Sequence, residues 1–193
     1  MSDEHELEEA REAEDKRVAL IIAVLALFLA LAEAGARNAE HHATELNIEA
    51  SDLYNFYQAK RIRSTVIETA LEGFEATART ATDDKAHDAI DKQVAAWKDA
   101  VARFEKDPKK PEDSMDAIQE RAKAATEGRE LSNRKLEHFE YASGALQIAI
   151  VLASASIITG IAALAWGAAA LGAIGAAFAA LGYLAPNLLN FLG

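Results

Sequence analysis

The apolar residues of this chain gather in two blocks that flank a long polar middle. The first block begins at Val18 and runs to Ala32 without a charged side chain. The second is the whole of residues 141–193, which contain no Asp, Glu, Lys, Arg or His. A helix needs about 20 apolar residues to cross the roughly 30 Å hydrocarbon core of a bilayer. The pattern therefore predicts an all-α integral membrane protein with three transmembrane helices, one near the N-terminus and two near the C-terminus.

The limits of the three spans follow from length and from the interfacial preference of tryptophan. We place the first span at residues 18–36, because the first apolar run alone is too short for a full crossing. The second block has room for spans at residues 141–165 and 167–186, divided at Trp166 because tryptophan favours membrane interfaces. Residues 187–193 then form a C-terminal tail. A single long span followed by an interfacial or re-entrant helix is the alternative for this block.

The polar middle, residues 37–140, is helical by pattern. Its apolar residues recur at three- and four-residue steps, the spacing of a helix with one apolar face. Breaks are expected near residues 80–84, where threonine and aspartate favour a turn and an N-cap, and near residues 107–112, which contain two prolines. The simplest arrangement is a long, coiled-coil-like extramembrane hairpin between the first and second spans. A compact three-helix bundle is the alternative.

Charge and composition narrow the classes of partner. The 193-residue chain has a net charge of −11 and no cysteine, which excludes disulfides, thiolate metal sites and cysteine nucleophiles. Residues 1–17 form an acidic tail, either a solvated or disordered segment or an arm that binds a protein. No block is strongly basic, so nucleic acid is not expected as a partner. The expected partner is the lipid bilayer.

Two segments of the chain resemble a known family. One begins at Asn47 with the letters NIEASD and continues to Arg63, and the other is LQIAIVLAS, from Leu146 to Ser154. Together they resemble a bacterial membrane-protein family known only as domain of unknown function 4337, over about residues 15–190. The resemblance implies one N-terminal and two C-terminal hydrophobic helices around a helical middle, and no activity. The proline-containing linker at residues 107–111 departs from the glycine-containing form of the family.

Four titratable residues are candidates for chemistry. Glu33 would lie near the end of the first span, and an acid inside a membrane is a functional candidate, with a carboxylate at headgroup level as the alternative. His41, Glu45 and His138 would form a metal site if the hairpin brought them to one height, since imidazole and carboxylate suit zinc. Exposed histidines at the membrane surface are the default, and no cofactor is expected.

Other candidates are contacts between helices. Phe56 and Tyr57 fit a helix–helix contact, and Gln147 in the second span either packs against another helix or lines a pore. Small residues at four-residue steps let helix backbones approach closely. The third span carries two such faces, which suggest contacts on two sides and hence a homo-oligomer. The first face is Ala168, Gly172, Ala176 and Ala180, and the second is Ala165, Ala169, Ala173 and Ala177.

No catalytic constellation accompanies these features. The sequence has no glycine-rich phosphate loop, no H-E-x-x-H motif and no nucleophile elbow, so an enzyme is not expected. We expect a non-enzymatic membrane scaffold or adaptor that self-associates through its helices. An oligomeric channel, or an accessory subunit of a larger membrane complex, is the alternative.

The expected location is the bacterial inner (cytoplasmic) membrane, which the chain crosses several times. Three basic residues precede the first span and only Arg37 soon follows it, which favours a cytoplasmic N-terminus. Basic residues ahead of the second span argue for the opposite orientation.

Overall fold

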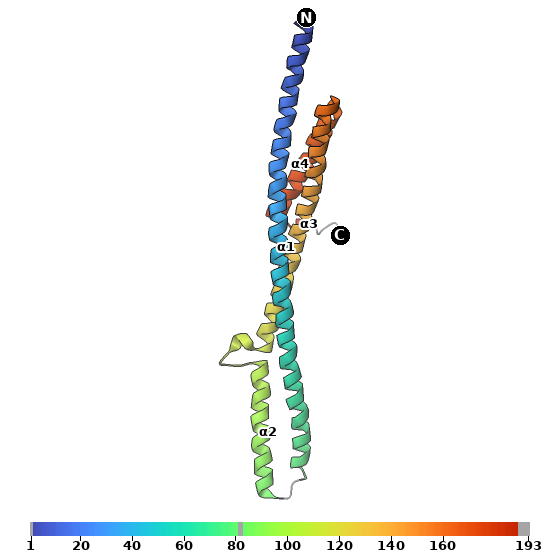
Figure 1. The fold of residues 1–193 in the computed structure, drawn as a ribbon. Helices are drawn as coiled ribbons and strands as arrows, with labels where there is room; N and C mark the ends of the chain where they lie inside the picture. Colours follow the sequence, from blue (N-terminus) through green and yellow to red (C-terminus); the bar gives the residue numbers. More distant parts are fainter. Residues whose placement is uncertain (1, 81–82, 189–193) are drawn as a thin grey trace. The chain divides into compact units, whose positions relative to one another are not determined.

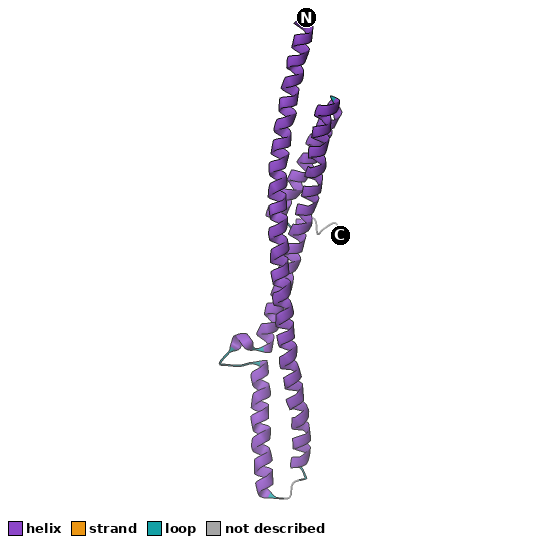
Figure 2. Ribbon diagram, viewed as in Figure 1, coloured by secondary structure: helices purple, strands orange, loops and turns teal. Residues whose placement is uncertain are grey.

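Helices make up every regular element in the described part of the chain. The computed structural model describes residues 2–80 and 83–188 (Figure 1). Four α-helices follow one another, and a short 3₁₀ helix precedes the third (Figure 2). They are α1 (Ser2–Ala78), α2 (Asp84–Glu105), η1 (Pro111–Asp113), α3 (Met115–Thr159) and α4 (Ala162–Leu184). The all-α class is confirmed, and α1, α3 and α4 are each long and apolar enough to cross a membrane.

The chain divides into two compact units. Unit 1 comprises Met1–Thr44 and Arg129–Gly193, and unit 2 comprises Glu45–Gly128. Two helices contribute to both units, because α1 and α3 each continue past a unit boundary. The helix α4 belongs to unit 1 alone, and α2 belongs to unit 2 alone. The predicted first span and the helix after it are thus parts of one helix.

The core of unit 1 is built where α1, α3 and α4 meet. Leu25 and Ala32 of α1 pack with Leu146 of α3 and Ala179 of α4 in one buried cluster. Four buried residues of α1 in this unit recur at seven-residue intervals, which keeps them on one side of a helix: Val18, Leu25, Ala32 and Ala39. Gly35 and Ala43 are buried as well, each within four residues of the nearest of these.

Glycines on α4 allow its backbone to approach α3 closely. A Cβ atom at Gly175 would lie 2.7 Å from Leu146 Cγ and 3.1 Å from the carbonyl oxygen of Ala142. Because the second of these neighbours is backbone, it has no rotamer with which to move away. A side chain at this position would therefore force the two helices apart.

The turn between α3 and α4 lies at Gly160 and Ile161 instead of at Trp166. Gly160 has a φ of 68°, a conformation that glycine adopts at little cost, and its N–H donates to the carbonyl oxygen of Ser156 at 2.8 Å. Trp166 lies inside α4 and is 78% exposed. The expected limits of both C-terminal spans are therefore displaced, since α3 ends at Thr159.

Unit 2 brings α1 beside α2. The rings of Phe74 and Trp97 meet edge to face with centroids 4.9 Å apart, and Lys98 Nζ lies 2.7 Å from Glu75 Oε1. These contacts join the last turns of α1 to the second half of α2 and give an antiparallel pair. The extramembrane hairpin as a whole stays a prediction, because it includes residues of both units.

The same unit holds the start of α3 against α1. Leu53 packs with Ile118 and Ala122 in a buried cluster, and Lys60 donates a hydrogen bond to the carbonyl oxygen of Asp113. The third helix begins at Met115 and not near Pro111, because Pro111 opens η1. Ser114 caps the helix, since its Oγ accepts a hydrogen bond from the N–H of Ala117 at 3.3 Å.

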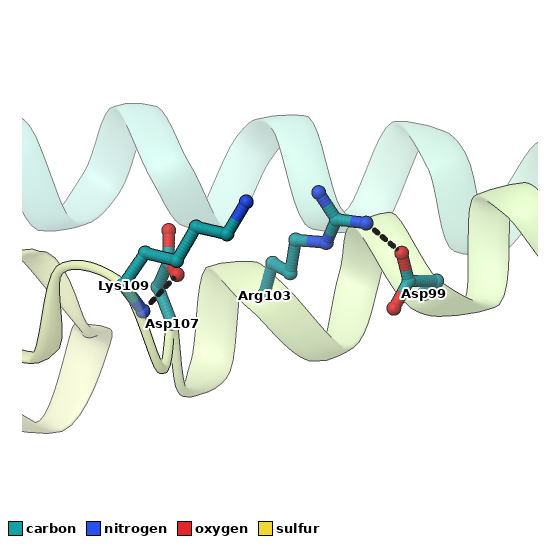
Figure 3. A network of polar contacts seen from close by, with 4 residues as sticks. All are labelled: Asp99, Arg103, Asp107 and Lys109. Carbon is teal, nitrogen blue, oxygen red and sulfur yellow. Dashed lines mark hydrogen bonds and ion pairs between the residues drawn. The ribbon is translucent and has the colours of Figure 1, made fainter.

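Side chains fix the geometry at the end of α2 (Figure 3). The carboxylate of Asp107 accepts a hydrogen bond from the backbone N–H of Lys109 at 2.8 Å, which closes a turn around the helix-breaking Pro108. One turn earlier in α2, Arg103 pairs with Asp99, and this hydrogen bond raises the pKa of Arg103. The polar contacts and the prolines together end α2 and redirect the chain.

Candidate interaction surfaces

A line of exposed apolar residues runs along α1 in unit 2. Ile48 is 56% exposed, Ile62 64% and Val66 63%. Ala59 and Gly73 are also exposed and lie on the same side, because the five positions follow one another at steps of eleven, three, four and seven residues, which stay on one face of a helix. We call these five residues the outer stripe.

The opposite side of α1 is the one that packs within unit 2. Leu53, Ser64 and Leu71 are buried there, and Ser64 donates a hydrogen bond to Glu68 at 2.8 Å. At 100° per residue these positions lie roughly half a turn around the helix from the outer stripe. In unit 2, α1 therefore has two apolar sides, one covered by α2 and α3 and one open.

The structure separates the two aromatic candidates for a helix contact. Tyr57 packs against the cluster of Leu53, Ile118 and Ala122, whereas Phe56 is exposed and has Lys60 Nζ 5.1 Å from its ring centroid. The two residues are adjacent, so they point about 100° apart on a helix. Of the two aromatic residues, Tyr57 is the one that packs in the cluster between α1 and α3.

The first small-residue face of α4 is only partly the one that packs. Ala168 and Gly172 are buried, Ala176 is half-buried and Ala180 is exposed. A row at constant four-residue steps drifts around a helix of 3.6 residues per turn, whereas alternating steps of four and three residues stay on one side. The buried residues follow the alternating pattern: Ala168, Gly172, Gly175, Ala179 and Gly182.

An apolar groove runs between α1 and α4 in unit 1. It encloses about 360 Å³ between Leu20, Val24 and Phe28 on one side and Ala169 and Ala173 on the other. The two alanines belong to the second small-residue face and are exposed. A groove of this kind accepts an aliphatic side chain from another helix or a lipid acyl chain.

The two polar candidates in the spans do not meet. Glu33 is half-buried, and its Oε2 lies 3.9 Å from Arg37 Nη1, one helical turn along α1. The position beside an arginine fits the headgroup-level alternative, and the intramembrane role stays a prediction. Gln147 is exposed on α3. Its predicted contact, with another helix or with a pore, stays a prediction.

The three predicted metal ligands are not gathered into a site. His138 is buried and its Nε2 lies 3.2 Å from the carbonyl oxygen of Pro186, while His41 and Glu45 are exposed on α1. Among the side chains that the structure describes, those of residues 16–80, 83 and 85–188, no group of three or more His, Asp and Glu is arranged to hold a metal ion. His138 instead ties α3 to the segment after α4, a contact that spacing alone does not reveal.

Charge contributes to the pairing of α1 with α2. The hydrogen bond and the positive charge of Lys98 lower the pKa of Glu75 below its ordinary value of 4.5. A carboxyl group whose pKa is lower in the folded state stabilises the fold at a pH above its unfolded-state pKa. That contribution is lost as the pH falls through the folded-state pKa. Because both side chains are largely solvated, the contribution is small.

We expect the substitution Lys98→Met to lower the melting temperature at pH 7 and to have no effect in acid. The difference between wild type and variant should shrink below pH 4.5 and vanish once Glu75 is protonated in the folded state. Circular dichroism melts across this pH range measure it, with Lys123→Met as a control for an exposed lysine paired on its own helix. A Lys98→Met difference that is constant with pH would show that the ion pair has no part in it.

Comparison with known proteins places the chain in a family without an assigned activity. No curated protein and no solved structure matches it. A family model described as "Domain of unknown function (DUF4337)" matches residues 14–185, nearly the whole chain. The chain therefore belongs to the DUF4337 family.

Proposed function

We propose that this chain is a non-enzymatic integral membrane scaffold or adaptor that self-associates through the outer stripe of α1. The observation that carries the proposal is the exposure of Ile62 and Val66 in the polar part of the helix. These residues follow the expected end of the first span by several helical turns, so lipid does not cover them. Large apolar side chains that line up on a water-exposed helix are typical of an interaction surface.

Insertion in the bilayer is supported by the apolar surface of unit 1. Many of its most exposed residues are large and apolar, among them Ile158 at 85% and Leu184 at 84%. Such a surface is stable in lipid and costly in water, where each Å² of exposed apolar area costs roughly 25 cal/mol. We propose the bacterial inner membrane, with the N-terminus in the cytoplasm as the balance of basic residues around the first span favours.

A second copy of the chain is the partner that best fits the outer stripe. Copies inserted in one membrane with the same orientation hold their α1 helices parallel, so that like residues face one another around a symmetry axis. The steps of eleven, three, four and seven residues in the stripe are distances between core positions of a heptad repeat, so they suit a parallel coiled-coil seam.

The absence of cysteine makes this proposal open to a clean crosslinking test. We expect Val66→Cys to form a disulfide-linked dimer when native membranes are oxidised. Glu72→Cys is the matched control, because Glu72 is exposed on the same helix but lies about 120° around it from Val66. Dimer from both variants in equal yield, or from neither, would contradict an interface at the outer stripe.

A channel is the second candidate, and the exposure of Gln147 on α3 favours it. A polar side chain on a membrane span tends to face another helix or an aqueous path, and this one is exposed on the surface of unit 1. Ion flux through the purified protein in liposomes that is lost in Gln147→Leu would favour the channel. Flux that the substitution does not change would leave Gln147 as a contact between copies.

A further inference from the structure

A second, more polar pocket lies in unit 1, where the charge-free C-terminal segment begins. It encloses about 310 Å³ between α1, α3 and α4. Asn38 and His42 of α1 line one side, Ser132, Lys135 and Phe139 of α3 another, and Tyr183 of α4 closes it. None of the side chains that line it is a carboxylate.

The apolar wall of this pocket is tightly built. Phe139 is 2% exposed, and a Cβ atom at Gly35 or at Gly182 would lie 2.8 Å from its ring. The ring therefore fits between the backbones of α1 and α4 only because both positions are glycine. Tyr183 packs edge to face on Phe139 with centroids 4.7 Å apart, and its hydroxyl donates a hydrogen bond to the carbonyl oxygen of Leu31 at 3.2 Å. These contacts fix the shape of the wall before any ligand binds.

The polar wall presents hydrogen-bond donors that the chain itself does not use. Among the described side chains, which are those of residues 16–80, 83 and 85–188, none pairs with Asn38, Ser132 or Lys135, and no backbone group does. Ser132 is only 4% exposed, so the side chain lies well inside the pocket wall. These donors are therefore free to bind a ligand.

The chemistry of the donors points to an anion. Lys135 brings a positive charge and three N–H donors, Asn38 an amide NH₂ and Ser132 a hydroxyl. Charge-assisted hydrogen bonds from such groups to phosphate oxygens are stronger than neutral ones. The absence of a lining carboxylate means that nothing in the pocket competes for Lys135.

We propose that this pocket binds a phosphate group, with the headgroup of an anionic phospholipid as its source. Its polar side is formed by α1 and α3 just before the segment that starts at Tyr141, which carries no charge. In a membrane this boundary is the depth at which lipid phosphates lie. The wall of Phe139 and Tyr183 suits the glycerol and the first methylenes of the acyl chains. Because the whole chain is acidic, attraction to anionic lipid requires a local site of this kind.

Native mass spectrometry of the full-length protein in detergent, titrated with phosphatidylglycerol, tests the proposal. We expect one lipid retained per chain, and an affinity reduced about tenfold or more in Lys135→Gln, because a charge-assisted hydrogen bond is lost. Asn38→Ala should weaken binding as well. Lys123→Gln is the matched control, since Lys123 is an exposed lysine of α3 that pairs with Glu127 outside the pocket. Circular dichroism checks that each variant is folded.

A parallel titration with inorganic phosphate distinguishes the two sources of the ligand. Lipid retention that depends on Lys135 and survives excess phosphate supports a headgroup site. Displacement of the lipid by phosphate, with the same dependence on Lys135, supports a phosphate site whose ligand is free in solution and overturns the lipid as its source. Retention that is equal in wild type, Lys135→Gln and Asn38→Ala would overturn the site altogether.

Discussion

Replacing Phe139 by alanine is expected to destabilise unit 1 by about 3–5 kcal/mol, the usual cost of removing a buried aromatic ring. Phe139 lies between the glycines of α1 and α4 and against the ring of Tyr183. Neither Gly35 nor Gly182 has a side chain that can move into the space left behind. The cavity therefore stays open, and the cost should fall at the upper end of the range. Unfolding by a denaturing detergent in mixed micelles, followed by circular dichroism, measures the loss.

Tyr141→Ala is the matched control for this prediction. Tyr141 follows Phe139 by two residues on the same helix but is 63% exposed. Its removal should cost much less, because most of its surface faces outward in the folded state. Equal losses in the two variants would mean that the three helices of unit 1 do not pack around Phe139.

Replacing Ile62 and Val66 together by glutamate is expected to weaken self-association by about 100-fold or more. The substitutions place charges at the centre of the proposed apolar contact, where each would lose its hydration without gaining a partner. The fold of the single chain should not change, because both positions are exposed and glutamate is a good helix former. The fraction of oligomer as a function of protein concentration in detergent measures the effect, with circular dichroism as the check on folding.

The control for this pair adds the same charge elsewhere on α1. Gln58 and Thr65 are exposed and lie roughly a quarter turn around the helix from the outer stripe. Gln58→Glu with Thr65→Glu should leave the oligomer intact. If the control pair dissociates it as fully as the test pair, then general repulsion between acidic chains is the cause, and the outer stripe is not the interface.

The features that follow from hydrophobic periodicity were predictable from the sequence. A charge-free block and a short apolar run predict three apolar helices, and the spacing of apolar residues between them is helical. What the pattern does not contain is how one helix is rotated against another. Phe56 and Tyr57 are equally good contact residues in the sequence, and only the packing of α1 on α3 selects Tyr57. The buried face of α4 differs from the predicted row of small residues at four-residue steps for the same reason.

Two positions, the turn between the C-terminal helices and the surroundings of His138, differ from the prediction. Trp166 suggested a membrane interface, but the turn required a residue that tolerates a positive φ, and Gly160 supplies it. The predicted hairpin places His138 near the same membrane surface as His41, which suggests a shared ligand. In the structure His138 is buried and contacts the carbonyl oxygen of Pro186, just after the end of α4. The polar pocket was invisible for a similar reason: its walls come from three helices that are distant in the sequence.

The mass of the wild-type protein, taken from its own membranes in native lipid particles, tests the central claim most directly. Self-association predicts a mass of two or more 20.7 kDa chains, after the lipid is subtracted, with no other polypeptide present. A single chain of 20.7 kDa at every concentration would contradict the claim. So would a complex in which one copy is bound only to other proteins.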